Sequence, residues 1–496
     1  MKYRILFLFI MLFNVGCEKY LEIKPTDRIN TQSFYQTEED AVLAINAAYA
    51  PLQYEGSFKR DLWIIGDIMS DDAIVGGAGA SEGISSLRLE DFNIQPDNEH
   101  VMALWAAHFS GIYYSNVALQ KIPDMDIDED LKQRILGEAY FLRATYYFYL
   151  AFYFGDVPLY STVPDPNNLE VPRSPVEDVW EQIISDYEKA GELLPAQHSG
   201  DDAGRALKGG AYGMLAKTHL VLENWQDCID ACQKVQEISS HFLLPNYADL
   251  WNYLISNNNA EVLFDVQHHY YEGGWNGTGN YISEFTAPRY RFIGDSRGWG
   301  FGVPTNNHVT ETYEAGDTRK QVNIISPGDS IWNQNAGEWY VHKAEYSPFT
   351  GYNVKKYLFL EYNGTNASMM FFPLNYHVLR LADVILMHAE ALNEIQGESA
   401  EALELVNQVR RRAFQDESHD LDGLNQDQLR EAIYKERRAE LFFEGWRWID
   451  LLRTGRAAQA LENIGNTNFN PNKHILLPIP QSEMDINPAL TQNPGY

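Results

Sequence analysis

The chain has 496 residues and a formal net charge of −31 at pH 7, and 45% of its residues are hydrophobic. So acidic a protein is repelled by phosphate backbones and anionic lipid head groups, which excludes nucleic-acid binding and membrane binding through protein charge. The length exceeds what one simple core usually fills, so we expect two lobes or an extended helical array.

The N-terminus has the pattern of a bacterial lipoprotein signal. Lys2 and Arg4 precede an apolar run over residues 5–13, and Gly16 and Cys17 follow it. This run is too short for a bilayer-spanning helix, which needs about 20 residues. We expect residues 1–16 to be a signal peptide and Cys17 to carry the lipid, which would be the protein's only membrane contact. An ordinary secretory signal with an incidental Cys17 is the alternative.

Residues 37–239 follow a helical period. Apolar side chains recur at steps of three and four through 131–154, and the Gly-Asp-Val-Pro sequence at 155–158 ends this pattern. Two shorter helices are predicted over 211–223 and 225–238, joined by a tight turn at Asn224. Cys228 and Cys232 lie on the apolar stripe of the second, so we interpret them as core residues.

Residues 251–376 have no helical period. Of these 126 residues 25 are aromatic, interspersed with glycine and asparagine, which favours loops with a few short strands such as 262–266. The helical pattern returns over 376–453, including one helix over 429–452. The tail, 475–496, is rich in proline and asparagine and is predicted to be extended over the body.

The predicted fold is therefore mainly α, with stacked helical hairpins like those of tetratricopeptide repeats and an irregular loop region. Small residues in the paired helices, such as Ala216, Ala231, Ala389 and Ala402, favour such hairpins, although no regular 34-residue period exists. We divide the chain into the signal (1–16), an N-terminal helical region (17–240) and a C-terminal region (241–496). The C-terminal region contains the aromatic loop segment (251–376), the helical return (377–455) and the tail (456–496), and we expect one compact unit.

No complete EF-hand, zinc-protease or serine-hydrolase motif occurs in the sequence. The acidic run 124–130 lacks the glycine and glutamate of an EF-hand, so we interpret it as a solvated connection into the next helix. His388 lies on an apolar stripe without H-E-x-x-H spacing and is predicted to be a core histidine. No G-x-S-x-G sequence occurs. A carboxylate pair for glycoside hydrolysis stays open, because nothing singles out two of the many acidic residues.

The densest charged set is predicted to be structural. Arg437, Glu440, Glu444 and Arg447 follow helical spacing, and such a ladder would fix its helix to neighbouring elements, with Gly445 allowing close approach.

The candidate ligand contacts lie in glycine-rich loops. Trp275 and Trp299 stand among glycines, whereas Trp63 and Trp105 lie in helical surroundings and are predicted to be core. Exposed aromatic faces suit stacking on sugar rings or peptide side chains. Asp71 and Asp72 precede another glycine-rich loop, residues 76–83, and their carboxylates could bind hydroxyl or amine groups. The full set of candidate ligand contacts is Asp71, Asp72, Arg88, Trp275, Tyr290 and Trp299, and packing beneath long loops is the alternative.

Several segments together resemble the SusD/RagB family of outer-membrane nutrient-binding lipoproteins. The resemblance begins at Cys17 and continues through the Gly-Glu-Ala-Tyr-Phe-Leu-Arg-Ala sequence at 137–144 and the Phe-Gly-Asp-Val-Pro-Leu sequence at 154–159. It resumes in the Arg-Leu-Ala-Asp sequence at 380–383 and the Glu-Arg-Arg-Ala-Glu-Leu sequence at 436–441. It closes with the Gln-Asn-Pro-Gly-Tyr sequence at 492–496. Each piece is weak alone, but the combination covers nearly all of the chain after the signal.

The resemblance implies a tetratricopeptide-like scaffold whose loops bind a nutrient oligomer without catalysis. It also implies a SusC-like TonB-dependent outer-membrane barrel as partner, with the protein lipid-anchored and facing the cell exterior. We therefore expect a surface lipoprotein that binds an oligosaccharide and passes it to the barrel, with no cofactor or metal. The alternatives are an oligopeptide-binding lipoprotein, a protein-binding scaffold and, least favoured, a surface glycosidase. The matched segments belong to the scaffold, so they carry over no ligand-contact residues.

Overall fold

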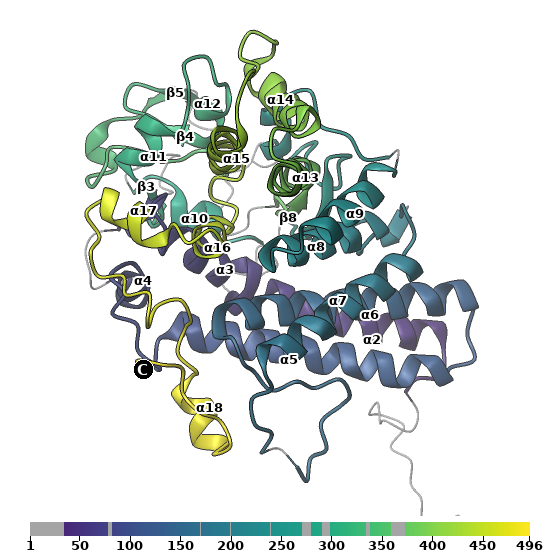
Figure 1. The fold of residues 1–496 in the computed structure, drawn as a ribbon. Helices are drawn as coiled ribbons and strands as arrows, with labels where there is room; N and C mark the ends of the chain where they lie inside the picture. Colours follow the sequence, from purple (N-terminus) through teal and green to yellow (C-terminus); the bar gives the residue numbers. More distant parts are fainter. Residues whose placement is uncertain are drawn as a thin grey trace, which may run out of the picture.

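Helices stacked side by side make up most of the structure (Figure 1). The computed structural model describes residues 34–77, 82–168, 170–198, 200–238, 240–269, 279–289, 298–333, 338–358 and 373–496. The first part of the stack contains α2 (Glu38–Tyr49), α5 (Glu99–Lys121), α6 (Glu129–Phe154), α7 (Val176–Leu193), α8 (Lys208–Val221) and α9 (Trp225–Gln236). From α5 to α9, each helix packs against the next. This arrangement confirms the predicted mainly α fold with helical hairpins.

Local sequence signals set the ends of α6. The Asp128 side chain accepts a hydrogen bond from the backbone N–H of Leu131 at 3.0 Å and so caps the helix. At the other end Gly155 has φ +68, a left-handed conformation that glycine adopts without strain. The acidic run 124–130 is therefore a connection that starts a helix, as predicted.

The stack continues in the C-terminal half. It contains α13 (Leu381–Gln396), α14 (Ala400–Phe414) and α15 (Gln426–Glu440), and α13 packs against both α8 and α9. The loop region separates α9 from α13 in the sequence, but the helical array passes directly from one to the other. Buried apolar residues from both halves belong to one hydrophobic cluster.

Short elements make up the loop region, as predicted. They are η7 (Tyr247–Trp251), β2 (Val262–Val266), α10 (Ile282–Thr286), β3 (Val303–Pro304), α11 (Asn306–Glu311), α12 (Arg319–Asn323), β4 (Ile324–Ile325), β5 (Ser330–Asn333), β6 (Glu338–Val341), η9 (Ala344–Tyr346), β7 (Asn353–Val354) and β8 (Tyr376–Arg380). Within the described residues, the strands form antiparallel pairs: β1 (Ala73–Ile74) with β3, β2 with β8, β4 with β7 and β5 with β6.

The helical return begins five residues later than predicted. Residues Tyr376–Arg380 form a buried strand that pairs with β2, and α13 starts at Leu381. A short apolar run fits a buried strand as well as a helix, so periodicity alone does not distinguish them.

The remaining short elements border the N-terminal helices and the C-terminal end. Near the N-terminal helices they are η2 (Ala50–Gln53), η3 (Glu55–Lys59), α3 (Asp61–Trp63), η4 (Ile64–Ile68), α4 (Ile84–Glu90), η5 (Ile122–Asp124) and η6 (Gly200–Asp202); toward the C-terminus they are α16 (Arg447–Arg453), α17 (Ala457–Asn463) and α18 (Gln481–Ile486). The tail packs over the body as predicted, with Leu477 and Ile479 buried, but it includes the helical turn of α18.

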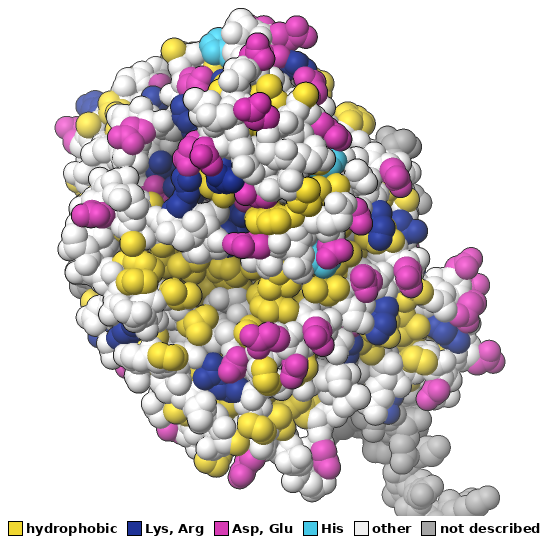
Figure 2. All heavy atoms as spheres, in the orientation of Figure 1, with side chains coloured by type: hydrophobic (Ala, Val, Ile, Leu, Met, Phe, Trp, Pro, Cys, Tyr) yellow, Lys and Arg dark blue, Asp and Glu magenta, His cyan; other side chains and the backbone are white. Residues whose placement is uncertain are grey.

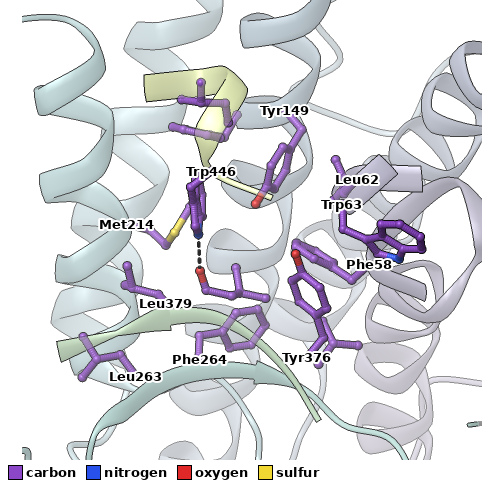
Figure 3. Packing of buried hydrophobic residues seen from close by; sticks show 14 of the residues in the cluster. Phe58, Leu62, Trp63, Tyr149, Met214, Leu263, Phe264, Tyr376, Leu379 and Trp446 are labelled. Carbon is purple, nitrogen blue, oxygen red and sulfur yellow. Dashed lines mark hydrogen bonds between the residues drawn. The ribbon is translucent and has the colours of Figure 1, made fainter. Parts of the chain in front are cut away.

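Aromatic rings fill the core where the helices meet the β2–β8 pair (Figure 3). The indole N–H of Trp446 donates to the backbone carbonyl of Val378 at 3.2 Å, which satisfies the one polar atom of that buried ring. Trp63 and Trp105 are buried, as predicted. Cys228 and Cys232 are both buried and free, which confirms their assignment to the core. His388 is likewise buried, and its Nδ1 lies 3.1 Å from the Gln236 side-chain oxygen.

The predicted single helix over 429–452 is wrong. Helix α15 ends at Glu440, and α16 begins only at Arg447. Between them Phe443 and Gly445 have φ +59 and +79. The turn brings Gly445 against Gly66, where an added Cβ on Gly66 would lie 2.2 Å from the Gly445 carbonyl oxygen. The predicted close approach at Gly445 is confirmed, but the charge ladder spans two helices and a turn.

Candidate functional site

Two glycine-rich loops meet at one edge of the loop region. The β1–β3 pair, with Ala73 opposite Pro304, brings the loop that begins at Gly76 against residues 298–302. The backbone N–H of Gly77 donates to the Gly300 carbonyl at 3.0 Å. A Cβ on Gly76 would lie 1.8 Å from the same oxygen, so only glycine allows this approach.

Trp299 stands on this pair of loops with part of its ring in solvent. The side chain is 36% exposed, and its ring packs 5.1 Å from Phe285 of α10 and 5.9 Å from Phe301. Both supporting rings are buried. A ring held this way presents an apolar surface of fixed orientation, as sugar stacking requires.

Glu284 lies beneath Trp299. Its backbone carbonyl accepts the Trp299 backbone N–H at 2.8 Å. Burial raises the pKa of the Glu284 carboxyl to about 7, against a hydrogen bond with the Trp299 side chain that lowers it. A second carboxyl supports the neighbouring loop: Glu90 accepts the Val75 backbone N–H at 2.6 Å, and burial raises its pKa to about 7. Both groups therefore change charge near neutral pH.

Two further contacts connect the segments around Trp299. Arg289 forms a bidentate ion pair with Glu82, at 2.6 Å for each nitrogen, and links the loop after α10 to the loop before α4. The Lys59 ammonium lies 4.1 Å from the centre of the Tyr281 ring. The site therefore combines a partly exposed aromatic face, partly buried carboxyls and charged groups at its edge.

Asp71 and Asp72 are buried and held by basic side chains. Arg447 Nε lies 2.8 Å from the Asp71 carboxylate, and Arg438 Nε lies 2.6 Å from that of Asp72. His308 Nδ1 lies 2.9 Å from Asp72. Burial acts to raise the Asp72 pKa, but Arg438, His308 and Arg447 outweigh it and hold the pKa well below its usual range. This geometry favours a structural role for both aspartates over ligand contact, because a ligand would have to displace the basic side chains that hold them.

The other predicted contacts are dispersed. Arg88 lies on α4 with its side chain 39% exposed, 4.0 Å from Asp97. Trp275, Tyr290 and the lipid attachment residue Cys17 lie outside the described residues. Sequence reasoning missed Glu284, Phe285, Arg289 and Glu82. The density of aromatic residues and glycines indicated the region, but no spacing pattern marks these four residues.

Among the residues that the structure describes, no group of three or more His, Cys, Asp or Glu side chains is placed to hold a metal ion. None of the described helices has the length and apolar character needed to cross a bilayer.

Comparison with known proteins identifies the fold and the family. Residues 257–496 match the family described as "SusD family", and residues 19–220 match the one described as "Starch-binding associating with outer membrane". The SusD-like protein P2 of Formosa agariphila is 32% identical over the full length of both chains. The chain belongs to the SusD family.

Solved structures agree with this assignment. One described as a laminarin-binding SusD-like protein is 30% identical, with a TM-score of 0.79 over 93% of this chain and 100% of that chain. A SusD homologue from Bacteroides thetaiotaomicron is 25% identical, with a TM-score of 0.82 over 95% of this chain and 99% of that chain.

Proposed function

We propose that this protein binds an oligosaccharide at the face that carries Trp299 and passes it unchanged to a TonB-dependent outer-membrane barrel. The part-exposed Trp299 ring, fixed by Phe285 and Phe301, is the observation that supports the binding site. The laminarin-binding relative supports a glycan as the ligand class. Membership of the SusD family supports the barrel partner and the outer-membrane location.

The other predicted ligand-contact residues have supporting roles in this proposal. Arg88, Trp275 and Tyr290 are candidates for contacts around the Trp299 face, while Asp71 and Asp72 would act through the arginines that hold them.

A lipid on Cys17 would keep the protein at the cell exterior. Replacing Cys17 by serine should release the protein from the membrane fraction. Metabolic labelling with palmitate tests the modification directly.

The binding proposal is tested with Trp299→Ala. Affinity electrophoresis and calorimetry would compare wild type and variant on laminarin, cellulose-derived, starch, xylan and mannan glycans. We expect the bound glycan to lose about tenfold in affinity, because stacking on one ring contributes on the order of 1 kcal/mol beyond its buried area. Trp339→Ala is the control, since Trp339 is 63% exposed on β6, outside this site.

Three results would contradict the proposal. Equal affinities for Trp299→Ala and wild type would place the site elsewhere. Binding of oligopeptides but of no glycan would change the ligand class. Appearance of shortened glycan after incubation with the purified protein would show an enzyme.

A further inference from the structure

An aromatic cleft lies away from Trp299, between α5, the segment that follows α6, and α18. Its volume is about 450 Å³. Its floor is the α5 stripe Trp105, Phe109 and Tyr113, which recur every four residues and so share one helix face. Helices α5 and α18 lie in the lower part of the molecule in Figure 1, and hydrophobic side chains are exposed in that part of the face in Figure 2, among charged ones.

The walls of the cleft come from segments distant in the sequence. Pro158, Tyr160 and Pro164 form one wall, and Ile486 and Leu490 belong to the other. The Tyr160 ring stands 6.0 Å from Phe109 at 81°. Tyr113 is 45% exposed and packs edge-on against Tyr114, at 5.4 Å. The rings therefore support one another and still leave faces open to the cleft.

The cleft also holds groups that can bind hydroxyls. In the part of the chain that the structure describes, the hydroxyls of Tyr113, Tyr114 and Tyr160 make no hydrogen bond within the protein. Burial raises the pKa of Glu483, against a hydrogen bond with the Trp105 side chain. Burial, and then the nearby Glu483 charge, raise the Tyr160 pKa. Tyr160 and Glu483 thus lie close enough to interact electrostatically without being bonded to each other.

The charge of the cleft selects among ligands. Among the described residues that line it, Glu483 alone is charged. With no lysine or arginine in the lining and a net charge of −31 on the chain, an anionic ligand would be repelled. Aromatic faces with hydroxyl donors and one carboxylate acceptor suit a neutral polyhydroxylated ring.

We propose that this cleft is a second saccharide-binding site, which holds neutral sugar rings against Tyr113, Phe109 and Tyr160, with Glu483 accepting from their hydroxyls. The inference rests on the proposed glycan-binding function. Occupation of two sites by one long chain would increase avidity for polysaccharides, because the second contact becomes intramolecular. In Figure 1, α18 lies at the lower edge of the molecule, apart from α10.

Tyr113→Ala tests the cleft, because the side chain is exposed and its removal leaves the core intact. Phe349→Ala is the matched control: Phe349 is 52% exposed and lies outside this cleft. Glu483→Gln removes the charge and keeps the shape of the side chain. Probes are laminarihexaose, cellohexaose, maltohexaose, xylohexaose and mannohexaose, together with the corresponding polysaccharides. Hydrogen exchange of peptides covering 105–121 and 481–490 reports on the cleft, and calorimetry gives the affinities.

We expect at least one hexasaccharide to slow exchange in these peptides, in wild type and in Trp299→Ala alike. Tyr113→Ala should weaken polysaccharide binding about three- to tenfold, and Phe349→Ala should not. One outcome overturns the inference and leaves the proposed function standing. In it a sugar binds through Trp299, hydrogen exchange in the cleft peptides does not change, and Tyr113→Ala binds as tightly as wild type. It is also overturned if Tyr113→Ala impairs only capture of the barrel. If no sugar binds the wild-type protein, both proposals fail.

Discussion

At the residue scale, Glu284 makes the stability of the Trp299 region depend on pH. Its pKa in the folded protein is about 7, above the ordinary 4.5 of glutamate, because burial disfavours the charged form. A raised pKa means that the folded state binds the proton more tightly than the unfolded chain does. The resulting stabilisation is fully present below pH 4.5 and is lost as the pH rises through 7.

Glu284→Gln should remove this dependence. The free energy of unfolding of wild type should fall between pH 5 and pH 8, and the fall should be smaller in the variant by on the order of 2 kcal/mol. Urea unfolding at the two pH values measures this difference. Glu417→Gln, at an exposed glutamate, is the control and should behave as wild type does. An identical pH dependence in Glu284→Gln and wild type would show that this carboxyl does not titrate there.

At the element scale, the cap of α6 provides a test confined to one acidic run. Asp128→Ala removes the hydrogen bond to the Leu131 N–H and should lower the free energy of unfolding by about 1 kcal/mol. Asp126→Ala is the control: it removes the same charge from the acidic run 124–130, at an exposed residue outside the helix. Thermal or urea unfolding of both variants separates capping from charge. Equal losses in the two would contradict a capping role for Asp128.

Elements were predictable from the sequence where their cause is local. The α8–α9 hairpin and the strand Val262–Val266 follow from periodicity and from the turn residues beside them. The break after Glu440 does not, because the Gly445 N–H donates to the Asp67 carboxylate at 2.9 Å, and Asp67 is 378 residues away in the sequence. A local pattern carries no information about such a partner.

The same limit applies to the candidate site. Glycines and aromatic residues indicated the loop that carries Trp299, since their composition is visible in any short window. The Arg289–Glu82 pair joins residues 207 apart, and the arginines that hold Asp71 and Asp72 lie in the last quarter of the chain. Their burial therefore had no signal in the sequence, and two aspartates that look available for a ligand are already paired.

At the scale of the whole molecule, a buried ion network joins the loop region to the helical stack. Glu440, at the end of α15, accepts from Arg380 at 2.8 Å, from Arg412 at 2.6 Å and from Arg319 at 3.1 Å. These arginines come from β8, α14 and α12, and all are buried. Burial acts to raise the Glu440 pKa, but the arginines outweigh it and hold the pKa far below its usual range. Glu440 therefore stays charged, and Arg412, Arg380 and Arg319 are fixed around it.

Glu440→Ala should destabilise the protein by about 3–5 kcal/mol, because it leaves buried guanidinium groups without their shared carboxylate. Glu440→Gln keeps the volume and should still lose much of this stability, which separates the charge from the packing. Glu404→Ala is the control: Glu404 pairs with Arg411 at the surface, where such a pair contributes about 0–1 kcal/mol. Urea unfolding compares the three variants, and a Glu440→Gln variant as stable as wild type would show that packing, not charge, holds this junction.

Because the network connects α12 and β8 to α14 and α15, its loss should loosen the loop region against the stack. Hydrogen exchange in residues 319–325 of Glu440→Gln should therefore quicken more than exchange in α6.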